Sequence, residues 1–345
     1  MNIGGFDFEN TENTLIIAEI SANHNQDIEV AKKTISEIKK SGANCVKLQT
    51  YTPDTLTIDS DKDDFKIKDS IWKGKSLFSL YNEAYTPWEW HKELFSFAKK
   101  EGLICFSSPF DKTAVDLLED LKAPAYKIAS FEINDIELID YAASKGKPII
   151  LSTGVATLAD IQLAIETCKK AGNNEIILLK CTSSYPAPLE DANLKMIQKY
   201  SKDFNVITGL SAHTIGDTCT IAAVSLGARV IEKHFILDRK MGGPDASFSM
   251  NPKEFSKMVK SIREVEKALG KIDYNLTENQ IKGKVFSRSL YVTKEIKKGE
   301  RFDNSNVRSI RPGFGLHPKE LKNIIGEYSN QDIEKGERFS LRFIK

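Results

Sequence analysis

Two histidines each close a short apolar stretch of the sequence, at the position where a β-strand would end. His213 closes GLSAH at 209–213, His234 closes VIEKH at 230–234, and one helix-length segment separates the two stretches. In a parallel α/β architecture these histidines lie on neighbouring strands at the same edge. Two imidazoles with oxygen ligands beside them suit Mn²⁺, Mg²⁺ or Fe²⁺, whereas a structural zinc site requires four protein ligands.

Two carboxylates are expected at the same edge. Glu19 ends the apolar stretch at 14–20, and Glu232 precedes His234 by two residues. Because side chains alternate along a strand, Glu232 and His234 share a face. In a closed barrel the first strand lies beside the last, so Glu19 approaches His234. The pattern predicts a divalent metal ion with nitrogen and oxygen ligands, and with positions left for water or substrate.

Cations and hydroxyl groups end the other strand-like stretches. The cations are Lys47 and Lys127, and the hydroxyl groups include Ser108, Ser130, Ser152, Ser183 and Ser211. Such a set of donors suits a phosphate or a ligand with both phosphate and carboxylate. A lone lysine can be a structural ion-pair partner, and a lone histidine a hydrogen-bonded core residue. Polar residues at the same end of so many apolar strands are harder to explain by structure alone.

Alternation of short apolar runs with helix-period segments predicts the elements that position these residues. The strand-like runs are 14–20, 44–49, 102–107, 125–129, 148–151, 175–180, 205–208 and 228–233, and helix-like segments include 27–41, 88–101, 157–170, 216–226 and 252–268. Eight such units predict a (β/α)₈ TIM barrel. A doubly wound open sheet is the alternative, and the lack of a glycine-rich dinucleotide turn disfavours it.

The chain is expected to divide into a barrel domain at 1–270, a linker at 271–284 and a small β-rich domain at 285–345, because the pattern becomes polar and then changes to short strands and turns. The segment 51–86 is long for a connection inside a compact domain. It is charged at first and then aromatic. Such a segment is either a lid or binding element, or a peripheral insertion.

Bulk composition excludes several classes of function. The 49 Lys and Arg residues nearly balance the 48 Asp and Glu residues, so no net charge favours nucleic acid or a membrane surface. No apolar run is long enough to cross a membrane, and the N-terminus lacks a signal-peptide pattern. The five cysteines form no CxxC pair, which is typical of reduced cysteines in a cytoplasmic protein. Cys181, at a strand end, is the best candidate for a catalytic thiol, a less favoured alternative.

Nearly the whole chain resembles the sialic acid (nonulosonic acid) synthase family. The motifs that carry the resemblance are IAEISANH at 17–24, VKLQT at 46–50, SSPF at 107–110, YKIAS at 126–130, STG at 152–154, KCTSSYP at 180–186, GLSAH at 209–213, EKHF at 232–235 and GPDASFS at 243–249. The C-terminal part is similar to the family's antifreeze-like (SAF) domain, with RSLY at 288–291 and RPG at 311–313.

The resemblance implies a reaction. Phosphoenolpyruvate condenses with the open-chain aldehyde of an acylated amino sugar, water adds, and phosphate leaves. The stretches at 49–57, 59–65 and 313–318 look most similar to the pseudaminic acid branch, whose sugar is 2,4-diacetamido-2,4,6-trideoxy-L-altrose. N-acetylneuraminate or legionaminate synthesis is the alternative within the family, and a metal-dependent barrel aldolase acting on pyruvate is another. The products of this branch imply flagellin glycosylation or cell-surface polysaccharide.

The resemblance also implies a role for each candidate residue. His213 and His234 match ligands of a Mn²⁺ or Mg²⁺ cofactor, and Glu19 and Glu232 match acidic catalytic residues. Phosphoenolpyruvate-binding positions are matched by Lys47, Ser108, Lys127, Ser130, Ser152, Ser183, Ser211 and Arg311. Position 183 is often Asn in the family. Sugar-side contacts are implied for Asn23, Gln49, Glu132, Tyr185 and Asp245.

Two further implications concern Arg311 and Ala212. In the family, an arginine at the position of Arg311 covers the active site of a second subunit, which implies a domain-swapped homodimer. Most family members have Asp immediately before the histidine that matches His213, where this chain has Ala212. An Asp there would support the metal ion or water. Its absence leaves a catalytically impaired binding or regulatory homologue as an alternative.

Overall fold

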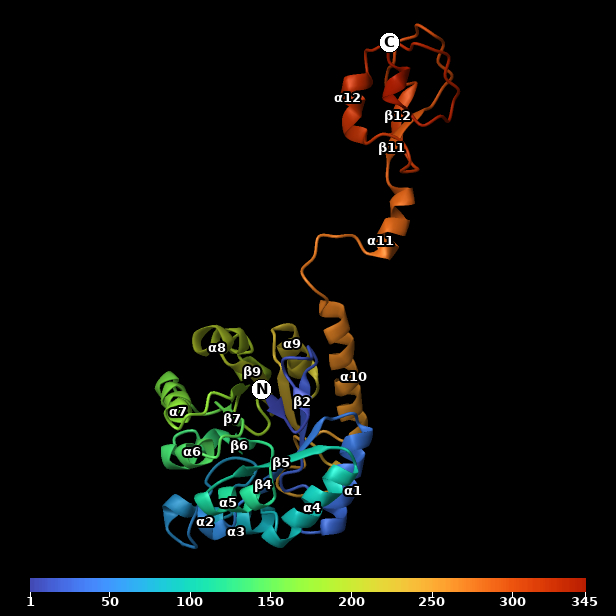
Figure 1. The fold of residues 1–345 in the computed structure, drawn as a ribbon. Helices are drawn as coiled ribbons and strands as arrows, with labels where there is room; N and C mark the ends of the chain where they lie inside the picture. Colours follow the sequence, from blue (N-terminus) through green and yellow to red (C-terminus); the bar gives the residue numbers. More distant parts are fainter. The chain divides into compact units, whose positions relative to one another are not determined.

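A computed structural model describes residues 1–345, and the chain forms two compact units, Met1–Gly270 and Lys271–Lys345. Figure 1 shows the first unit as strands surrounded by helices, and the second as a smaller unit with short strands and short helices.

The first unit is a closed barrel of eight parallel strands, in the order β10-β3-β4-β5-β6-β7-β8-β9. The strands are β3 (Leu15–Glu19), β4 (Cys45–Thr50), β5 (Ile104–Pro109), β6 (Tyr126–Ile128), β7 (Ile149–Ser152), β8 (Ile176–Cys181), β9 (Ile207–Ala212) and β10 (Val230–His234). Each coincides with one of the predicted runs to within a few residues. The (β/α)₈ prediction is therefore confirmed, and the open-sheet alternative is wrong.

Helices surround the barrel and return the chain from one strand to the next. They are α1 (Ile28–Lys40), α4 (Trp88–Lys100), α5 (Lys112–Asp120), α6 (Ile136–Ala143), α7 (Leu158–Lys170), α8 (Met196–Phe204), α9 (Thr218–Ser225) and α10 (Pro252–Leu269). Local sequence sets where several begin. Asp27 caps α1, and the capping boxes Thr157/Asp160 and Asn251/Glu254 start α7 and α10.

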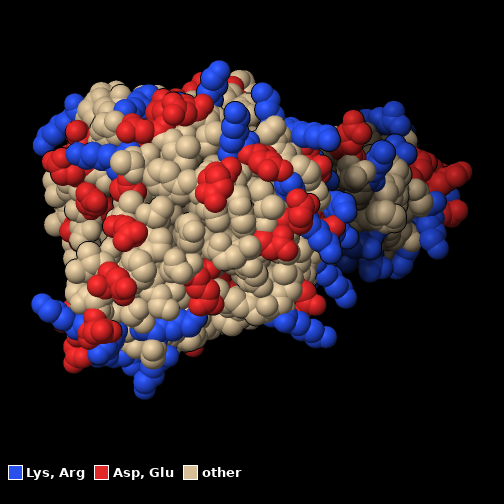
Figure 2. Space-filling view, turned by 90° about the horizontal axis from the view of Figure 1, so that it is seen from below, with Lys and Arg blue, Asp and Glu red and all other residues tan.

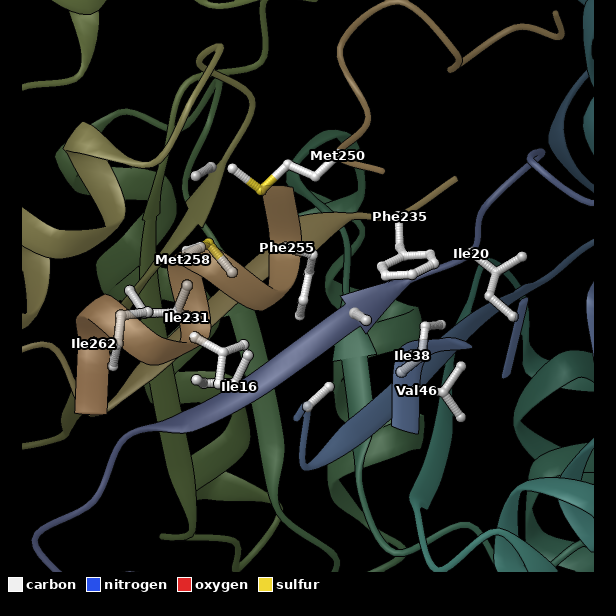
Figure 3. Packing of buried hydrophobic residues seen from close by; sticks show 14 of the residues in the cluster. Ile16, Ile20, Ile38, Val46, Ile231, Phe235, Met250, Phe255, Met258 and Ile262 are labelled. Atoms are coloured by element: carbon white, nitrogen blue, oxygen red, sulfur yellow. The ribbon is translucent and has the colours of Figure 1, made fainter. Parts of the chain in front are cut away.

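Apolar residues on the outer face of the strands pack against these helices. In Figure 3, Ile16 and Ile231 from adjacent strands lie beside Met258 and Ile262 of α10. A separate core inside the barrel includes Leu15, Ile150, Ile177 and Val230, all fully buried. Ile3 and Phe8 join this inner core from the short hairpin of β1 (Asn2–Ile3) and β2 (Phe6–Asp7), which the sequence pattern did not predict. The inner core and hairpin hold the strands from which the site is built.

Strand β9 extends further than predicted. The expected run ended at 208, but β9 continues to Ala212 through Gly209, a residue type that usually weakens a strand. A Cβ atom at Gly209 would lie 2.2 Å from the backbone oxygen of Val230. Glycine is therefore required by the close approach of β10, and it allows the strand to continue into the polar residues at its end.

The segment 51–86 is folded. It contains α2 (Pro53–Leu56), the 3₁₀ turn η1 (Asp63–Phe65) and α3 (Leu77–Ala84). The indole nitrogen of Trp72 donates a hydrogen bond of 2.9 Å to the Pro244 carbonyl, and the Gln26 side chain donates one of 2.6 Å to the Tyr85 carbonyl. The segment is thus tied to the barrel at both its middle and its end.

The second unit has its own small core. It contains α11 (Glu278–Gly283), the antiparallel pair β11 (Ser289–Val292) and β12 (Val307–Ile310), and α12 (Leu321–Ile324), with the 3₁₀ turns η5 (Lys284–Phe286), η6 (Pro318–Glu320) and η7 (Leu341–Phe343). Leu290, Phe302, Val307, Phe339 and Phe343 are almost fully buried together. The stretch expected to be a linker therefore includes the helix α11, started by the capping box Thr277/Gln280.

The surface carries charge of both signs. In Figure 2, acidic and basic side chains are scattered among other residues over the face shown, and neither sign forms one continuous patch. This matches the near balance of charges in the sequence. None of the helices combines the length and the apolar character that crossing a membrane would require.

Candidate functional site

Two lysines and two glutamates form a buried ionic network at the C-terminal end of the barrel. The strand register places His234, Glu19 and Lys47 side by side on β10, β3 and β4. The Lys47 ammonium lies 3.0 Å from a carboxylate oxygen of Glu19 and 3.0 Å from one of Glu232. Lys127 lies 2.9 Å from the same Glu232 oxygen, which also accepts a bond of 3.0 Å from Ser211. All four charged side chains are at most 4% exposed.

The members of this network support each other's charges. Burial by itself raises the pKa of Glu19 and of Glu232, but the lysine ammonium groups hold both pKa values below the ordinary value. Burial lowers the pKa of Lys47, and its two carboxylate neighbours more than reverse this, so its pKa is raised. Lys127 has only the shared Glu232 as a bonded carboxylate, and burial leaves its pKa lowered. With one anion for each cation, the network has no excess charge before a ligand binds.

His213 and His234 face one another beside this network, with ring centroids 5.4 Å apart. The Nδ1 atom of His213 lies 3.0 Å from the Thr182 carbonyl. A proton on that nitrogen is donated to the carbonyl and leaves Nε2 with a free lone pair. His234 lies with Nε2 3.3 Å from Glu19 and Nδ1 3.6 Å from Asp245, and its buried Nδ1 has no hydrogen-bond partner.

The donor set is compatible with a divalent metal ion that is only partly held by protein. The two imidazoles supply nitrogen ligands, and a carboxylate lies next to each nitrogen of His234. No group of three or more His, Cys, Asp or Glu side chains that could hold a metal ion is present. A metal ion bound by the two histidines would therefore take its other ligands from water or substrate, as open catalytic sites do.

These groups line one cavity of about 430 Å³. The structure brings most of the predicted site residues together on its wall: Glu19, Lys47, Gln49, Lys127, Ser130, Glu132, Ser152, Tyr185, Ser211, His213, Glu232, His234 and Asp245. The cavity also exposes Ser21, which the sequence reasoning missed. Ser21 donates a hydrogen bond to the Asp245 carboxylate. Its position between Glu19 and Asn23, at the end of the first strand, was the available signal.

Three predicted residues of the first unit do not line the cavity wall. Asn23 is fully buried, and its side-chain amide donates to the Phe235 carbonyl and to Ser249, so it joins two parts of the chain behind the wall. The Ser108 hydroxyl lies 3.4 Å from the Lys47 ammonium and is positioned to orient that lysine. Ser183 lies beside Gly154. A Cβ atom added at position 154 would lie 2.0 Å from the Ser183 hydroxyl oxygen.

The serines near Gly154 have unused hydrogen-bonding capacity. The Gly154 amide donates a bond of 3.1 Å to Ser130, and the hydroxyl oxygens of Ser152 and Ser183 are buried without a partner. Buried polar atoms are normally paired, so unpartnered hydroxyls next to a cavity suggest a ligand that completes them. Together with Lys47 and Lys127, they suit an anion.

One side of the cavity is formed by apolar and aromatic residues of the segment 51–86. They are Tyr51, Leu56, Ile67, Trp72, Leu77, Leu80, Tyr81 and Ala84, and we call them the apolar wall. Trp72 packs against Tyr185 with ring centroids 5.6 Å apart, and Tyr185 packs against His213 at 4.4 Å. The segment is therefore a binding element rather than a peripheral insertion. The sequence carried a signal for part of this wall, because Leu77, Leu80, Tyr81 and Ala84 recur at helical spacing in α3. Leu56, Ile67 and Trp72 follow no such period.

Glu132 differs from the other carboxylates of the cavity. Burial raises its pKa to about 7, and one of its oxygens is buried without a hydrogen-bond partner. Near neutral pH a large fraction of Glu132 therefore carries a proton. Lys127 and Lys47 oppose the rise in pKa only in part. The cavity thus holds an acid in Glu132 and two bases in Glu19 and Glu232, a separation of pKa values typical of acid–base catalysis.

Glu132→Gln is expected to stabilise the protein at pH 8 by about 3 kcal/mol. The pKa of Glu132 rises on folding from 4.5 to about 7, so ionised Glu132 opposes folding above pH 7, and this cost vanishes as the pH falls towards 4.5. Urea unfolding at pH 8 and pH 5 measures the difference. Glu137→Gln, at an exposed position in α6, is the matched control. A gain of equal size at both pH values would contradict a raised pKa.

Ala212 lies on the opposite face of β9 from the cavity. Ser211 and His213 line the cavity, whereas Ala212 packs in the outer core with Cys219 of α9. Its register partner on β10 is Lys233, which is 1% exposed and donates to the carbonyls of Ala212 and Thr214. Lys233 thus bonds to the backbone on both sides of His213. An Asp at position 212 would lie next to Lys233 rather than in the cavity.

Ala212→Asp is therefore expected to change kcat/KM by less than about threefold, because additional charge outside the cavity mainly pairs with Lys233. Steady-state kinetics checks this, with Ala212→Asn as a control for side-chain size. A gain of about tenfold or more in the Asp variant alone would instead indicate that the natural Ala impairs catalysis.

Arg311 belongs to the second unit, where its side chain is exposed next to β12. The cavity described above is lined entirely by residues of the first unit.

Comparison with known proteins gives consistent matches to both units. Residues 34–274 match the sequence model of the NeuB family, and residues 287–340 match that of the SAF domain. The chain is 48% identical to a pseudaminic acid synthase of Campylobacter jejuni over 98% of each chain. It is 49% identical to one of Helicobacter pylori over 92% of this chain and 94% of the relative. A crystal structure of N-acetylneuraminic acid synthetase from Leptospira borgpetersenii has a TM-score of 0.72 and 30% identity, over 82% of this chain and 92% of that one.

Proposed function

Because the chain belongs to the NeuB family, we propose that it is an enzyme that makes pseudaminic acid by condensing phosphoenolpyruvate with 2,4-diacetamido-2,4,6-trideoxy-L-altrose and water, with release of phosphate. The observation that carries this proposal is one cavity with lysines for an anion, two facing histidines, and carboxylates in both protonation states. Relatives that make legionaminic acid are less similar, at 34–36% identity.

Phosphoenolpyruvate is expected to bind at the lysine end of the cavity. Its phosphate and carboxylate are both negatively charged, and the ionic network has no spare positive charge to balance them. Lys47 and Lys127 would therefore turn from Glu232 towards the ligand. The hydroxyls of Ser130, Ser152 and Ser211, and Ser183 behind them, complete the set of donors. This repartnering releases a Glu232 carboxylate next to the reacting carbons.

A Mn²⁺ or Mg²⁺ ion fits the pair of histidines, with His213 and His234 as its protein ligands. When bound, it would supply a Lewis acid that orients and polarises the sugar aldehyde. The Thr182 carbonyl fixes the ring of His213, and Tyr185 and Phe248 pack against the histidine rings and restrict their rotation.

Two proton transfers remain for the protein. As the enol carbon of phosphoenolpyruvate bonds to the aldehyde carbon, the aldehyde oxygen takes up a proton, which Glu132 can donate because burial keeps it partly protonated. Water then adds to the oxocarbenium carbon and loses a proton, which Glu19 or Glu232 can accept. Both are ionised before the ligand binds, and Glu232 becomes a stronger base once the lysines turn to the ligand. Phosphate then leaves by cleavage of the carbon–oxygen bond and takes up the hydroxyl proton of the intermediate, and the ketone of the product forms.

A homodimer would complete the site. Exposed apolar side chains follow four consecutive barrel strands, β6 to β9: Phe131, Val155, Leu189 and Ile215 are each more than half exposed. Such residues around a cavity mouth suit contact with another protein surface. We propose that the SAF unit of a second copy covers this mouth and contributes Arg311 to the phosphoenolpyruvate site, as in a domain-swapped dimer.

Arg311→Ala is expected to raise the KM for phosphoenolpyruvate by about tenfold or more, because a charge-assisted contact to the ligand is lost. The melting temperature of the barrel should not change. Arg308→Ala, at another exposed position in the same unit, should leave the KM unchanged. An unchanged KM in the Arg311 variant would remove this arginine from the active site.

The proposed function is tested by phosphate release from phosphoenolpyruvate. Turnover should require both a divalent metal ion and the altrose derivative, and should be much slower with N-acetylmannosamine or with the legionaminate precursor. Equal or faster turnover with either sugar would overturn the substrate assignment. Use of pyruvate in place of phosphoenolpyruvate would identify an aldolase instead.

A further inference from the structure

The cavity has two chemically different sides. The strand ends supply charged and metal-binding groups, including Lys47, Lys127, Glu232 and the two histidines. The apolar wall, from the segment 51–86, supplies no charged side chain to the cavity. The segment is nonetheless rich in charge, and all its charged residues except Lys75 are exposed to solvent. The segment 51–86 therefore has a charged surface towards solvent and an apolar surface towards the cavity.

Backbone and side-chain contacts hold the apolar wall in place. Around Ile67, the chain forms a short turn in which the Ile67 amide donates to the Lys75 carbonyl at 2.9 Å, and the Gly74 amide donates to the Ile67 carbonyl at 3.0 Å. Lys75 forms an ion pair with Glu83 of α3. The backbone around Ile67 and Leu77 is thus held by contacts that do not involve the side chains of these two residues. Both side chains can therefore be substituted without removing these contacts.

The orientation of an open-chain sugar follows from where it must react. Its aldehyde carbon has to lie at the strand ends, where the donors for phosphoenolpyruvate and the histidines lie. Its last carbon is the farthest from that point along the chain. Apart from the strand ends and the loops that follow them, the cavity is lined mainly by the apolar wall, so the far end of the sugar is expected to lie against it. In the proposed substrate that last carbon is a methyl group, because the sugar is a 6-deoxy sugar.

The geometry points to the apolar wall as a subsite that selects sugars with a methyl group at C6 over sugars with a hydroxyl there. This inference rests on the proposed function and names the part of the cavity that determines its sugar specificity. The only hydroxyl groups of this wall belong to Tyr51 and Tyr81. A 6-hydroxyl group that lies against Ile67 and Leu77 is buried next to side chains that offer no hydrogen bond. Apolar pockets discriminate against one added hydroxyl by about 10- to 100-fold.

The test compares two sugars that differ only at C6, the altrose derivative with its methyl group and the same sugar with a 6-hydroxyl. The wild-type protein should prefer the methyl sugar in kcat/KM by about 10- to 100-fold. Ile67→Thr, which keeps a branched side chain but adds a hydroxyl, should reduce this preference by about fivefold or more, mainly through the KM of the hydroxyl sugar. Leu77→Asn should act in the same direction.

Ile71→Thr is the matched control, because Ile71 belongs to the same segment but is 49% exposed and does not line the cavity. Its preference should equal that of the wild type. Quenching of tryptophan fluorescence by each sugar, to which Trp72 in the apolar wall is expected to respond, measures binding in any variant that no longer turns over. An unchanged preference in both Ile67→Thr and Leu77→Asn, or no preference in the wild type, would overturn the inference. Because turnover of the methyl sugar itself tests the proposed function, the two failures are distinguishable.

Discussion

Lys47→Met is expected to lower kcat/KM for phosphoenolpyruvate by about 10²- to 10³-fold and to destabilise the protein by about 3–5 kcal/mol. Lys47 is 2% exposed and contacts both Glu19 and Glu232 at 3.0 Å. Without its ammonium, Glu19 keeps only a hydrogen bond from Gln49 and a contact with His234, so a buried carboxylate remains without a full counter-charge. Phosphate-release kinetics and urea unfolding measure the two effects.

A surface lysine provides the control for the Lys47 variant. Lys40→Met removes an ammonium that pairs with Glu37 at 2.7 Å but is 70% exposed, and it should change stability by no more than about 0.5 kcal/mol. The double variant Lys47→Met with Glu19→Gln separates charge balance from chemistry. It should recover much of the lost stability and none of the activity. Recovery of activity would mean that Lys47 acts only by neutralising Glu19.

Glu232→Gln is expected to lower kcat by about 10²- to 10⁴-fold without raising the KM for phosphoenolpyruvate. Glu232 is proposed to accept the proton of the attacking water, so its loss slows the chemical step. The same carboxylate occupies Lys47 and Lys127 before the ligand binds, and its removal frees them for the anion. The KM should therefore stay constant or fall.

The measurement on Glu232→Gln is best made at pH 6.5. Burial lowers the pKa of Lys127 and the Glu232 carboxylate opposes this, so the variant lysine loses its proton more readily at higher pH. Glu37→Gln, which removes a carboxylate from an exposed pair, is the control and should leave both constants unchanged. A tenfold increase in KM with kcat preserved would make Glu232 a binding residue and leave the proton transfer to Glu19.

Local pattern was sufficient to predict the barrel and the strand ends from which the site is built. Short apolar runs that alternate with helical segments are properties of neighbouring residues, and each of the eight strands was identified in this way. Since the C-terminal ends of parallel strands converge in a closed barrel, residues such as Lys47, Glu232 and His234 could be expected to meet without knowledge of any contact. The boundaries were less certain, as β9 shows at Gly209.

Partners inside the site were decided only by the tertiary structure. Lys47 pairs with both Glu19 and Glu232, Asn23 lies behind the cavity wall, and Ala212 faces Lys233. Each of these contacts depends on how the strands are aligned. The apolar wall depends on how a long connection folds back across the barrel. By itself the sequence determined which residue types stand at each strand end, because that pattern is local. The register and the path of the segment 51–86 arise from contacts between distant residues, so only the folded chain shows which of those residues touch.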